Sequence, residues 1–206
     1  MMPYPPLKRV LDIALAAVLL VTLSPLMTLV GLCGLVLQGR PVLFVQVRPG
    51  LHERAFKLLK FRTMAGTTPV MAGQTTENHP TRFGKILRAL SLDELPQLIN
   101  ILLGEMSFVG PRPLLMEYLP LYSNQEKRRH NVRPGLTGLA QVGGRNQVPW
   151  KQRLALDVLY VDNQSLYMDI GIILRSVILV LTRRGVSAED SEIMPRFRGT
   201  EISEAE

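Results

Sequence analysis

Cysteine and aromatic residues are scarce in this chain, and each shortage excludes a class of protein. Cys33 is the only cysteine among 206 residues, so neither a disulfide framework nor a cysteine-rich zinc site can form within one chain. Aromatic residues make up only 6% of the sequence, which leaves few side chains for stacking on nucleic-acid bases. Because 47% of the residues are hydrophobic, the formal net charge of +7 favours a membrane surface, and we expect no nucleic-acid partner.

Charged residues are absent from a long apolar run that extends from Ile13 to Leu37. A straight helix of about 25 residues would be roughly 37 Å long, which is enough to cross a bilayer. The run is too long for the hydrophobic part of a signal peptide, and no small-residue cleavage site follows it. We therefore expect this segment to enter the membrane.

Ser24-Pro25 lies in the middle of this run and favours a bent helix. Proline removes a backbone donor and clashes with the preceding turn, and the Ser24 hydroxyl can bond a carbonyl that the bend leaves free. Positive charge flanks both ends of the run, at Lys8-Arg9 and at Arg40 and Arg48. This symmetry suits a hairpin with both ends in the cytoplasm. Proline also occurs in spanning helices, so the residues leave a straight transmembrane helix open.

Short strands, loops and helices follow the apolar run. β-Branched and aromatic residues predict two strands, at 41–46 and 55–62, which pair as a hairpin around a turn at 48–51. Two stretches rich in glycine, proline and polar residues, 63–81 and 133–149, predict loops, and long loops in compact domains are usually functional. The predicted helical segments are 83–90, 91–103, 114–129 with an interruption at Pro120, 150–160, and the core or interfacial helix 170–181.

These elements predict an α-rich α+β fold in three parts. Residues 1–40 form a broken re-entrant membrane helix hairpin. Residues 41–187 form a compact cytoplasmic domain with interfacial helices and a small β-hairpin, a size that suits a single core. Residues 188–206 form a polar tail that is expected to be disordered.

Asp93-Glu94 is the pair of residues most suggestive of chemistry. Taken alone, two acids at a helix start complement the helix dipole, and Glu94 completes a capping box with Ser91 as the N-cap. Neighbouring carboxylates on a helix point in different directions, so one can act as a nucleophile and the other as a metal ligand. Basic residues accompany the pair in the sequence, at Lys60, Arg62, Lys85, Arg88, Arg112, Arg133 and Arg145. Arg112 stands between two prolines, and an arginine on a rigid turn is suited to bidentate phosphate binding.

Several sequence runs occur in a recognisable order. The longest are L-S-L-D-E-L-P-Q over 90–97, M-S-F-V-G-P-R-P over 106–113 and V-R-P-G-L-T-G-L-A-Q-V over 132–142. Shorter ones are Lys8-Arg9, Asp12, Ser24-Pro25, Arg48-Pro49-Gly50 and K-F-R-T-M over 60–64. From about Leu7 to Gly185 the chain resembles the bacterial sugar transferase family, the monotopic phosphoglycosyl transferases, in the minimal form that lacks the N-terminal membrane domain of larger members. Arg62 stands where a lysine is half expected.

The resemblance implies an enzyme that moves a phospho-sugar from a UDP-sugar to undecaprenyl phosphate, releases UMP and initiates glycoconjugate assembly. It implies that Asp93 is the nucleophile and forms a covalent aspartyl phospho-sugar, that Glu94 holds Mg²⁺ together with Asp93, and that Ser24-Pro25 breaks a re-entrant helix. The residues expected to contact or support the substrates are Lys60, Arg62, Arg88, Arg112, Arg133, Gln141, Arg145 and Asp157.

Likeness to the minimal members points to UDP-N,N′-diacetylbacillosamine as the donor and to protein glycosylation, with UDP-GlcNAc and UDP-GalNAc as the next donors. Membrane lipids and downstream glycosyltransferases are the other partners that the resemblance implies. The expected location is the bacterial inner membrane, with the catalytic domain on the cytoplasmic face.

Two other classes of protein explain part of the pattern. A non-enzymatic binding or scaffold protein, anchored by the hairpin, explains the apolar run and the basic charge but not the carboxylates among arginines beside a long Gly/Pro loop. A nucleic-acid-binding protein explains only the charge. UMP release from a UDP-sugar with Mg²⁺ distinguishes the enzyme from the first, and salt-dependent DNA binding distinguishes it from the second.

Overall fold

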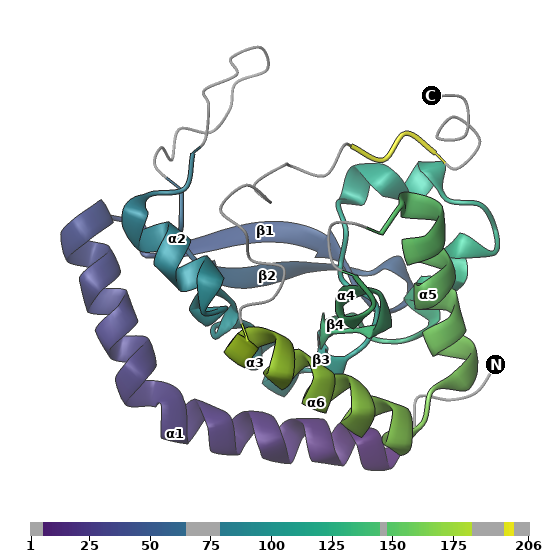
Figure 1. Ribbon diagram of the computed structural model, residues 1–206, viewed down its shortest axis with the longest axis horizontal. Helices are drawn as coiled ribbons and strands as arrows, with labels where there is room; N and C mark the ends of the chain where they lie inside the picture. Colours follow the sequence, from purple (N-terminus) through teal and green to yellow (C-terminus); the bar gives the residue numbers. More distant parts are fainter. Residues whose placement is uncertain (1–5, 65–78, 145–147, 183–195, 200–206) are drawn as a thin grey trace.

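A single long helix frames the structure. The computed structural model describes residues 6–64, 79–144, 148–182 and 196–199. Helix α1 (Pro6–Gln38) follows one side of the molecule and then turns up a second side, and the shorter elements lie between (Figure 1). Those elements are, in chain order, β1 (Leu43–Pro49), η1 (Leu51–Glu53), β2 (Ala55–Phe61), α2 (Arg82–Ala89), η2 (Leu92–Glu94), α3 (Gln97–Leu103), β3 (Ser107–Val109), η3 (Met116–Leu121), η4 (Glu126–Asn131), β4 (Gly135–Thr137), α4 (Leu139–Val142), α5 (Trp150–Asn163) and α6 (Leu166–Thr182).

Helix α1 remains one helix through Pro25 but bends near its middle (Figure 1). Pro25 has no backbone N–H, so the carbonyl of Val21, four residues earlier, loses its ordinary partner. The Ser24 hydroxyl donates to that carbonyl at 2.8 Å, which offsets the loss. The predicted bend and the predicted role of Ser24 are confirmed. The interruption is a bend within one helix, and the structure does not separate two helical legs.

The N-terminal half of α1 is fixed to the rest of the protein by a buried polar group, here called the anchor cluster (Lys8, Tyr160 and Asp169). Lys8 forms an ion pair with Asp169 of α6 and donates to the Tyr160 hydroxyl of α5 at 3.0 Å. Its Nζ also donates to the Val109 carbonyl at 3.1 Å. Lys8 is therefore a packing residue inside the protein, whereas the sequence suggested a charge that simply flanks the apolar run.

Two arginines hold helix ends through backbone carbonyls. Arg9 donates to the carbonyls of Ile101 and Leu102, at the end of α3, at 2.7 and 3.1 Å. Arg62, which follows β2, donates to three carbonyls at the end of α1, those of residues 38, 39 and 40. Such bonds satisfy carbonyls that have no partner within the helix. Both ends of α1 are consequently attached to the same domain.

The predicted β-hairpin is confirmed and supports one face of the site. Strands β1 and β2 pair antiparallel, with Leu43 opposite Phe61 and Lys60 opposite Phe44. Asn100 of α3 is 1% exposed and bonds the free edge of β2: its Oδ1 accepts from the N–H of Leu59 at 3.1 Å, and its Nδ2 donates to the carbonyl of residue 57 at 2.8 Å. This docking brings α3, and the turn η2 before it, against β2.

The stretch 133–149 is more regular than predicted, because it contains β4 and α4. Strand β4 pairs parallel with β3, and this pairing requires very close backbone contact. A Cβ on Gly135 would lie 2.1 Å from the amide nitrogen of Gly110, and one on Gly110 would lie 2.4 Å from the Arg133 carbonyl oxygen. Only glycine fits at these two positions, which explains why both motifs carry it.

The stretch 114–129 and the four described residues of the C-terminal tail, 196–199, also differ from the prediction. Residues 116–121 and 126–131 form 3-10 helices, where one interrupted α-helix was expected. In the tail, Phe197 is 3% exposed and packs with Tyr118, Tyr122 and Trp150. The described residues 196–199 therefore belong to the folded domain, because an apolar ring within the polar tail has a buried position there.

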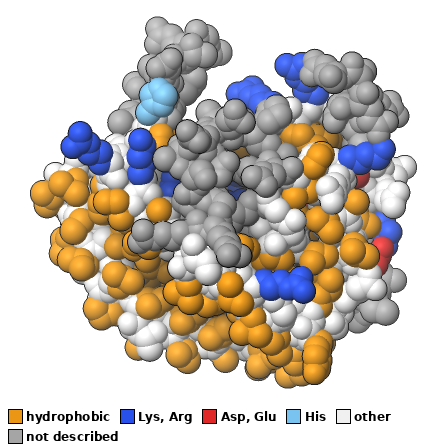
Figure 2. Space-filling view, viewed as in Figure 1, with side chains coloured by type: hydrophobic (Ala, Val, Ile, Leu, Met, Phe, Trp, Pro, Cys, Tyr) orange, Lys and Arg blue, Asp and Glu red, His pale blue; other side chains and the backbone are white. Residues whose placement is uncertain are grey.

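Apolar side chains gather along the lower and left borders of the molecule, over α1 and the neighbouring α6 (Figure 2). On α1, Val21 and Val36 are 75% and 82% exposed, and on α6 Tyr167 and Leu181 are 92% and 77% exposed. Helix α1 is long and apolar enough to cross a membrane. Apolar exposure of this extent marks a surface that meets lipid or another protein.

Candidate functional site

Glu94 is the centre of an ion-pair network built from three elements. Its Oε1 accepts a hydrogen bond from Lys60 Nζ of β2 at 2.6 Å and one from Arg112 Nη2, in the turn after β3, at 2.8 Å. The Glu94 and Lys60 side chains are 18% and 19% exposed. We call Lys60, Asp93, Glu94 and Arg112 the catalytic cluster, after the role that the family resemblance implies for Asp93 and Glu94. All four residues are candidates from the sequence, and they lie close together in the structure.

The predicted capping box at Ser91 is wrong. Ser91 adopts a left-handed backbone conformation, with φ 54°, and its side chain caps no backbone group. The Glu94 carboxylate bonds Lys60 and Arg112, so it does not serve the backbone N–H of Ser91. Tertiary ion pairs therefore replace the local cap, and the explanation of Asp93-Glu94 as a simple helix start fails for Glu94.

Asp93 lies beside this network in a different environment. It is 8% exposed, and within the described part of the chain no hydrogen bond reaches its carboxylate. Burial raises the pKa of Asp93 and neighbouring Glu94 raises it further, while the charges of Lys60, Arg112 and Arg88 lower it. A buried carboxylate near cations, without direct bonds to them, is available to an incoming electrophile.

The pKa values of the two carboxylates are consequently shifted in opposite directions. Burial alone would raise the pKa of Glu94, but Arg112 and Lys60 outweigh it and lower that pKa to about 2. Burial lowers the pKa of Lys60, and Glu94 opposes this by holding its proton. Glu94 raises the pKa of Arg112. Glu94 is thus a permanent anion that orients two cations, and Asp93 is the group whose charge is costly and reactive.

Three successive carbonyls fix the turn that carries Arg112. The Pro111 carbonyl accepts from the Gly135 N–H at 3.0 Å, and the Arg112 carbonyl accepts from Arg129 Nη2 at 2.7 Å. The Pro113 carbonyl accepts from Arg48 Nη1 at 3.3 Å. With φ also restricted at both prolines, the guanidinium of Arg112 has a defined position, as an anion-binding arginine requires.

Asp157 acts on this turn through Arg129, which the sequence analysis did not single out. Arg129 is 2% exposed and donates to Asp157 Oδ2 through Nη2 at 2.7 Å and through Nε at 3.1 Å. Asp157 therefore supports the site indirectly, through the arginine that bonds the Arg112 carbonyl. Arg129 was missed because it lies in a run of basic residues, 127–130, that looks like a solvated surface.

Arg48 is a second basic residue that the sequence analysis did not assign to the site. Burial and the nearby charge of Arg112 lower the pKa of Arg48 to about 10. Its side chain is held by Gln46 Oε1, which accepts from Arg48 Nη2 at 2.6 Å. The motif Arg48-Pro49-Gly50 was the available signal, and it indicated a turn without indicating which groups the turn would meet.

The other predicted substrate residues are distributed over the domain. Arg88 of α2 donates to Thr63 Oγ1 at 3.0 Å and is close enough to lower the pKa of Asp93. Arg62 holds the end of α1, and Arg133 Nε donates to the Gly104 carbonyl at 2.7 Å, at the end of α3 remote from Glu94. Gln141 donates to the Leu136 carbonyl at 3.1 Å. Arg145 lies outside the described residues.

The carboxylates fit one mode of Mg²⁺ binding. Within the described ranges, no three His, Cys, Asp or Glu side chains are grouped to hold a metal. Mg²⁺ does not require such a group, because it commonly takes one or two carboxylates and fills its shell with water and phosphate oxygens. Adjacent Asp93 and Glu94 match that arrangement, and the surrounding cations favour an anionic ligand that would bring the remaining oxygens.

Comparison with known proteins agrees with this geometry. Residues 4–183 match the model of the family described as bacterial sugar transferase. A relative from Bacillus subtilis, named uncharacterized sugar transferase EpsL, is 44% identical over 94% of this chain and 96% of its own length. UDP-glucose:undecaprenyl-phosphate glucose-1-phosphate transferase of Caulobacter vibrioides is 44% identical over 85% of this chain and 70% of its own.

A third relative is a much longer protein. Undecaprenyl-phosphate galactose phosphotransferase of Salmonella typhimurium is 35% identical over 87% of this chain and 41% of its own length. The match of the family model, over residues 4–183, includes α1, Lys60, Asp93, Glu94, Arg112 and α6. The chain belongs to the bacterial sugar transferase family.

Proposed function

We propose that this enzyme transfers a phospho-sugar from a UDP-sugar to undecaprenyl phosphate, through a covalent intermediate on Asp93. The observation that carries the proposal is a contrast between two carboxylates. Asp93 is buried and accepts no hydrogen bond from the residues that the structure describes, whereas Glu94 bonds Lys60 and Arg112. The names of the Caulobacter and Salmonella relatives support undecaprenyl phosphate as the acceptor, and the first of them supports a UDP-sugar donor.

In the first step, an oxygen of the Asp93 carboxylate attacks the phosphorus atom that bears the sugar. A new P–O bond to Asp93 forms, the bond to the bridging oxygen breaks, and UMP leaves with that oxygen and its electron pair. Lys60 and Arg112 lie beside the nucleophile and bear the positive charge that the diphosphate requires. Their bonds to Glu94 hold them in place before the substrate arrives.

In the second step, a phosphate oxygen of the lipid attacks the same phosphorus atom. The bond to Asp93 breaks, the free carboxylate is restored and a polyprenyl diphosphate sugar forms. One phosphoanhydride is lost and one is made, so no further energy source is needed. Mg²⁺, held by Asp93 and Glu94, would supply positive charge toward the diphosphate and the leaving nucleotide.

The placement of α1 supports a re-entrant membrane helix. Lys8 near its start contacts Asp169, and residues 38–40 at its end are bonded by Arg62. A helix attached to one domain at both ends and bent at Pro25 enters the lipid and returns to the same side. The exposed apolar face of α6 lies on the same border and would rest at the lipid surface. The catalytic cluster would then face the cytoplasm, at the inner membrane of a bacterium.

Cysteine labelling tests this topology. Cys33 is replaced by alanine and a cysteine is introduced at position 4. In intact cells a membrane-impermeant maleimide should leave it unmodified, and permeabilisation should allow labelling. A matched variant with leucine at positions 24 and 25 should straighten α1 and expose the introduced cysteine. Labelling of the unaltered Ser24-Pro25 protein in intact cells would exclude the re-entrant arrangement.

A donor panel tests the reaction and identifies the sugar. Purified protein in detergent is incubated with undecaprenyl phosphate, Mg²⁺ and one of UDP-glucose, UDP-galactose, UDP-GlcNAc, UDP-GalNAc or UDP-N,N′-diacetylbacillosamine. The names of the relatives favour glucose or galactose over the acetamido sugars that the sequence analysis placed first. UMP release with at least one donor, lost on chelation of Mg²⁺, is the expected result. Absence of release from every donor would refute the proposal.

A further inference from the structure

The described part of the C-terminal tail consists of an apolar anchor between two cations. Phe197 is 3% exposed, whereas Arg196 and Arg198 on either side are exposed. The Phe197 ring lies 5.6 Å from Tyr118, 5.5 Å from Tyr122 and 5.3 Å from Trp150 between ring centroids. Rings at these distances pack favourably, so the segment 196–199 is held at a defined place and its arginines with it.

This aromatic contact continues to the catalytic cluster through bonded groups. Arg129 Nη1 donates to the Tyr122 hydroxyl at 3.3 Å, and Arg129 Nη2 donates to the Arg112 carbonyl at 2.7 Å. Arg48 provides a second connection. Its pKa is lowered by burial and by Arg112 and raised by Tyr118, Tyr122 and Glu117. One guanidinium thus lies within electrostatic reach of both Arg112 and the neighbourhood of Phe197.

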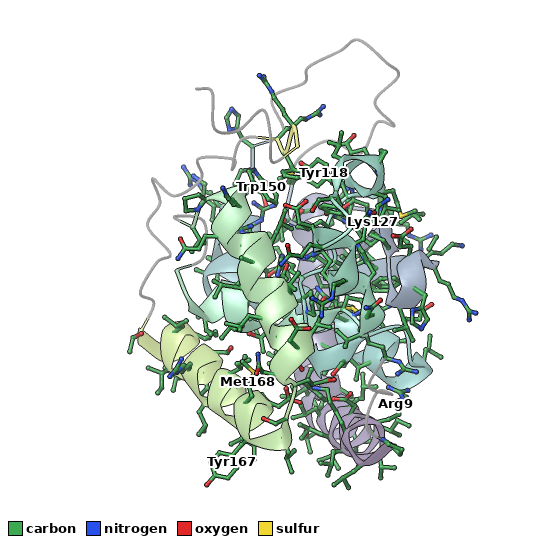
Figure 3. All side chains as sticks on the ribbon, turned by 90° about the vertical axis from the view of Figure 1, so that its right-hand side faces the viewer. Arg9, Tyr118, Lys127, Trp150, Tyr167 and Met168 are labelled. Atoms are coloured by element: carbon green, nitrogen blue, oxygen red, sulfur yellow. The ribbon has the colours of Figure 1, made fainter. Side chains whose placement is uncertain are left out.

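An open pocket of about 520 Å³ lies between the tail and η3, lined by Glu117, Tyr118, Leu121, Arg196, Phe197 and Arg198. Figure 3 labels Tyr118 and Trp150 at the end of the molecule where the described tail lies, and Figure 1 shows that segment above η3 and the start of α5. The volume is within the range of small-molecule sites. No sequence motif indicates a function for this part of the tail.

We propose that this pocket is the subsite for the nucleoside monophosphate half of the donor, an inference that rests on the proposed function. Arg196 and Arg198 would bind the phosphate beside the nucleoside, in continuation of Arg48 and Arg112. Glu117 would accept hydrogen bonds from the ribose hydroxyls, and the apolar wall at Tyr118 and Leu121 would contact the base. The Glu117 carboxylate would repel a bare phosphate or an anionic lipid headgroup, so it does not fit a site for either ligand.

The single tryptophan provides a binding assay that does not depend on turnover. Trp150 is the only tryptophan in the chain and packs against Phe197, so occupation of the pocket should change its fluorescence. The full-length protein in detergent is titrated with UMP, with uridine, with inorganic phosphate and with vesicles of anionic phospholipid. UMP should bind more tightly than uridine or phosphate alone. Phosphate or vesicles that bind as tightly as UMP would overturn the nucleoside assignment.

Substitution of the tail arginines tests the same site. Arg196→Ala with Arg198→Ala should weaken UMP binding about tenfold or more and raise KM for the UDP-sugar by a similar factor, with the larger part of the loss in KM. Both side chains are exposed, so the fold should survive, as circular dichroism would show. Arg54→Ala, exposed at the β1–β2 turn, is the matched control and should bind UMP as the unaltered protein does.

The outcomes separate the subsite from the reaction. An unaltered protein that releases UMP normally, together with a double variant of unchanged UMP affinity and KM, would overturn the subsite and leave the reaction intact. An unaltered protein that releases no UMP from any donor would overturn the proposed function. Phe197→Ala adds a further check, because loss of the anchor should weaken UMP binding although both arginines remain. Unchanged binding in that variant would also contradict the proposal.

Discussion

The anchor cluster and the catalytic cluster are built from similar groups but differ in how completely those groups are paired. In the anchor cluster, Lys8 Nζ has three acceptors, and Asp169 accepts from both Lys8 and the Tyr160 hydroxyl. Among the described residues, one cation there is paired with one anion. In the catalytic cluster both cations bond Glu94, and the Asp93 carboxylate has no hydrogen bond from the described residues.

This difference distinguishes a polar group that fixes the packing of helices from one that can bind and react with a ligand. A buried polar group whose donors and acceptors are all satisfied fixes a packing arrangement and has no free donor or acceptor for a ligand. A buried carboxylate without bonds, surrounded by cations that are oriented by a second carboxylate, retains both reactivity and an affinity for anions. Substitutions in the anchor cluster should therefore change stability without changing turnover, whereas substitutions in the catalytic cluster should reduce turnover.

Asp93→Asn should reduce turnover more than any other substitution, and it should increase stability. An amide cannot form the acyl phosphate, so UMP release should fall below detection. Because the pKa of Asp93 is raised in the folded protein, its contribution to stability is present below the ordinary pKa of 3.8 and is lost as pH rises. At neutral pH the ionised group opposes folding, so Asn should raise the melting temperature. Turnover by this variant at the rate of the unaltered protein would refute the assignment.

Glu94→Gln should reduce turnover at least a hundredfold and also reduce stability, unlike Asp93→Asn. Loss of the anion leaves Lys60 and Arg112 without their shared partner. Such a loss costs about 3 kcal/mol or more in a fully buried pair, and we expect less here because the Glu94 and Lys60 side chains are 18% and 19% exposed. Since the pKa of Glu94 is lowered to about 2, the stability that its ionised carboxylate contributes is present above about pH 4.5 and disappears as pH falls through 2. Denaturant unfolding between pH 7 and pH 2 measures it. A variant with unchanged stability would show that Glu94 organises neither cation.

The fold was predictable where local pattern decides the structure. The β-hairpin, α2, α5 and α6 follow from β-branched and aromatic residues and from apolar or amphipathic helical segments, and all are present near the expected residues. The helix predicted to end at Leu103 ends there as α3. The bend at Pro25 was predictable for the same reason, because a missing N–H acts on its own helix.

Part of the site required tertiary information. Asp93-Glu94, Lys60 and Arg112 carry motif and composition signals, but Arg129 resembles the surface residues around it, and only its bonds to Asp157 and to the Arg112 carbonyl reveal its role. Ser91 has the sequence of a helix cap, yet ion pairs to Glu94 override that local preference. Phe197 is an isolated ring in a polar tail, and no periodicity connects it to Tyr118 or Trp150.

Arg112→Ala should reduce kcat/KM by about ten- to a hundredfold, because a charge-assisted contact with phosphate is worth about 1.5–3 kcal/mol. The side chain is 42% exposed, so stability should change less than in Glu94→Gln. Arg112→Lys should recover only part of the activity, since an ammonium restores charge without the planar fork. Steady-state kinetics over a range of donor concentrations measures both variants. Unchanged kinetics with a lower melting temperature would make Arg112 a structural residue.

Lys8→Met should leave the turnover of each folded molecule unchanged and reduce stability. Among the described residues, the variant leaves the buried Asp169 carboxylate with the Tyr160 hydroxyl as its side-chain partner. Removal of one member of a buried pair costs about 3–5 kcal/mol. A second variant, Lys8→Met with Asp169→Leu, removes both charges and should recover much of the loss, because apolar side chains of similar size can replace a buried ion pair. Thermal unfolding in detergent measures both, and UMP release is normalised to the folded fraction. If Lys8→Met remained as stable as the unaltered protein but lost turnover, the anchor cluster would take part in catalysis. Complete pairing of a buried polar group would then not distinguish a packing role from a catalytic one.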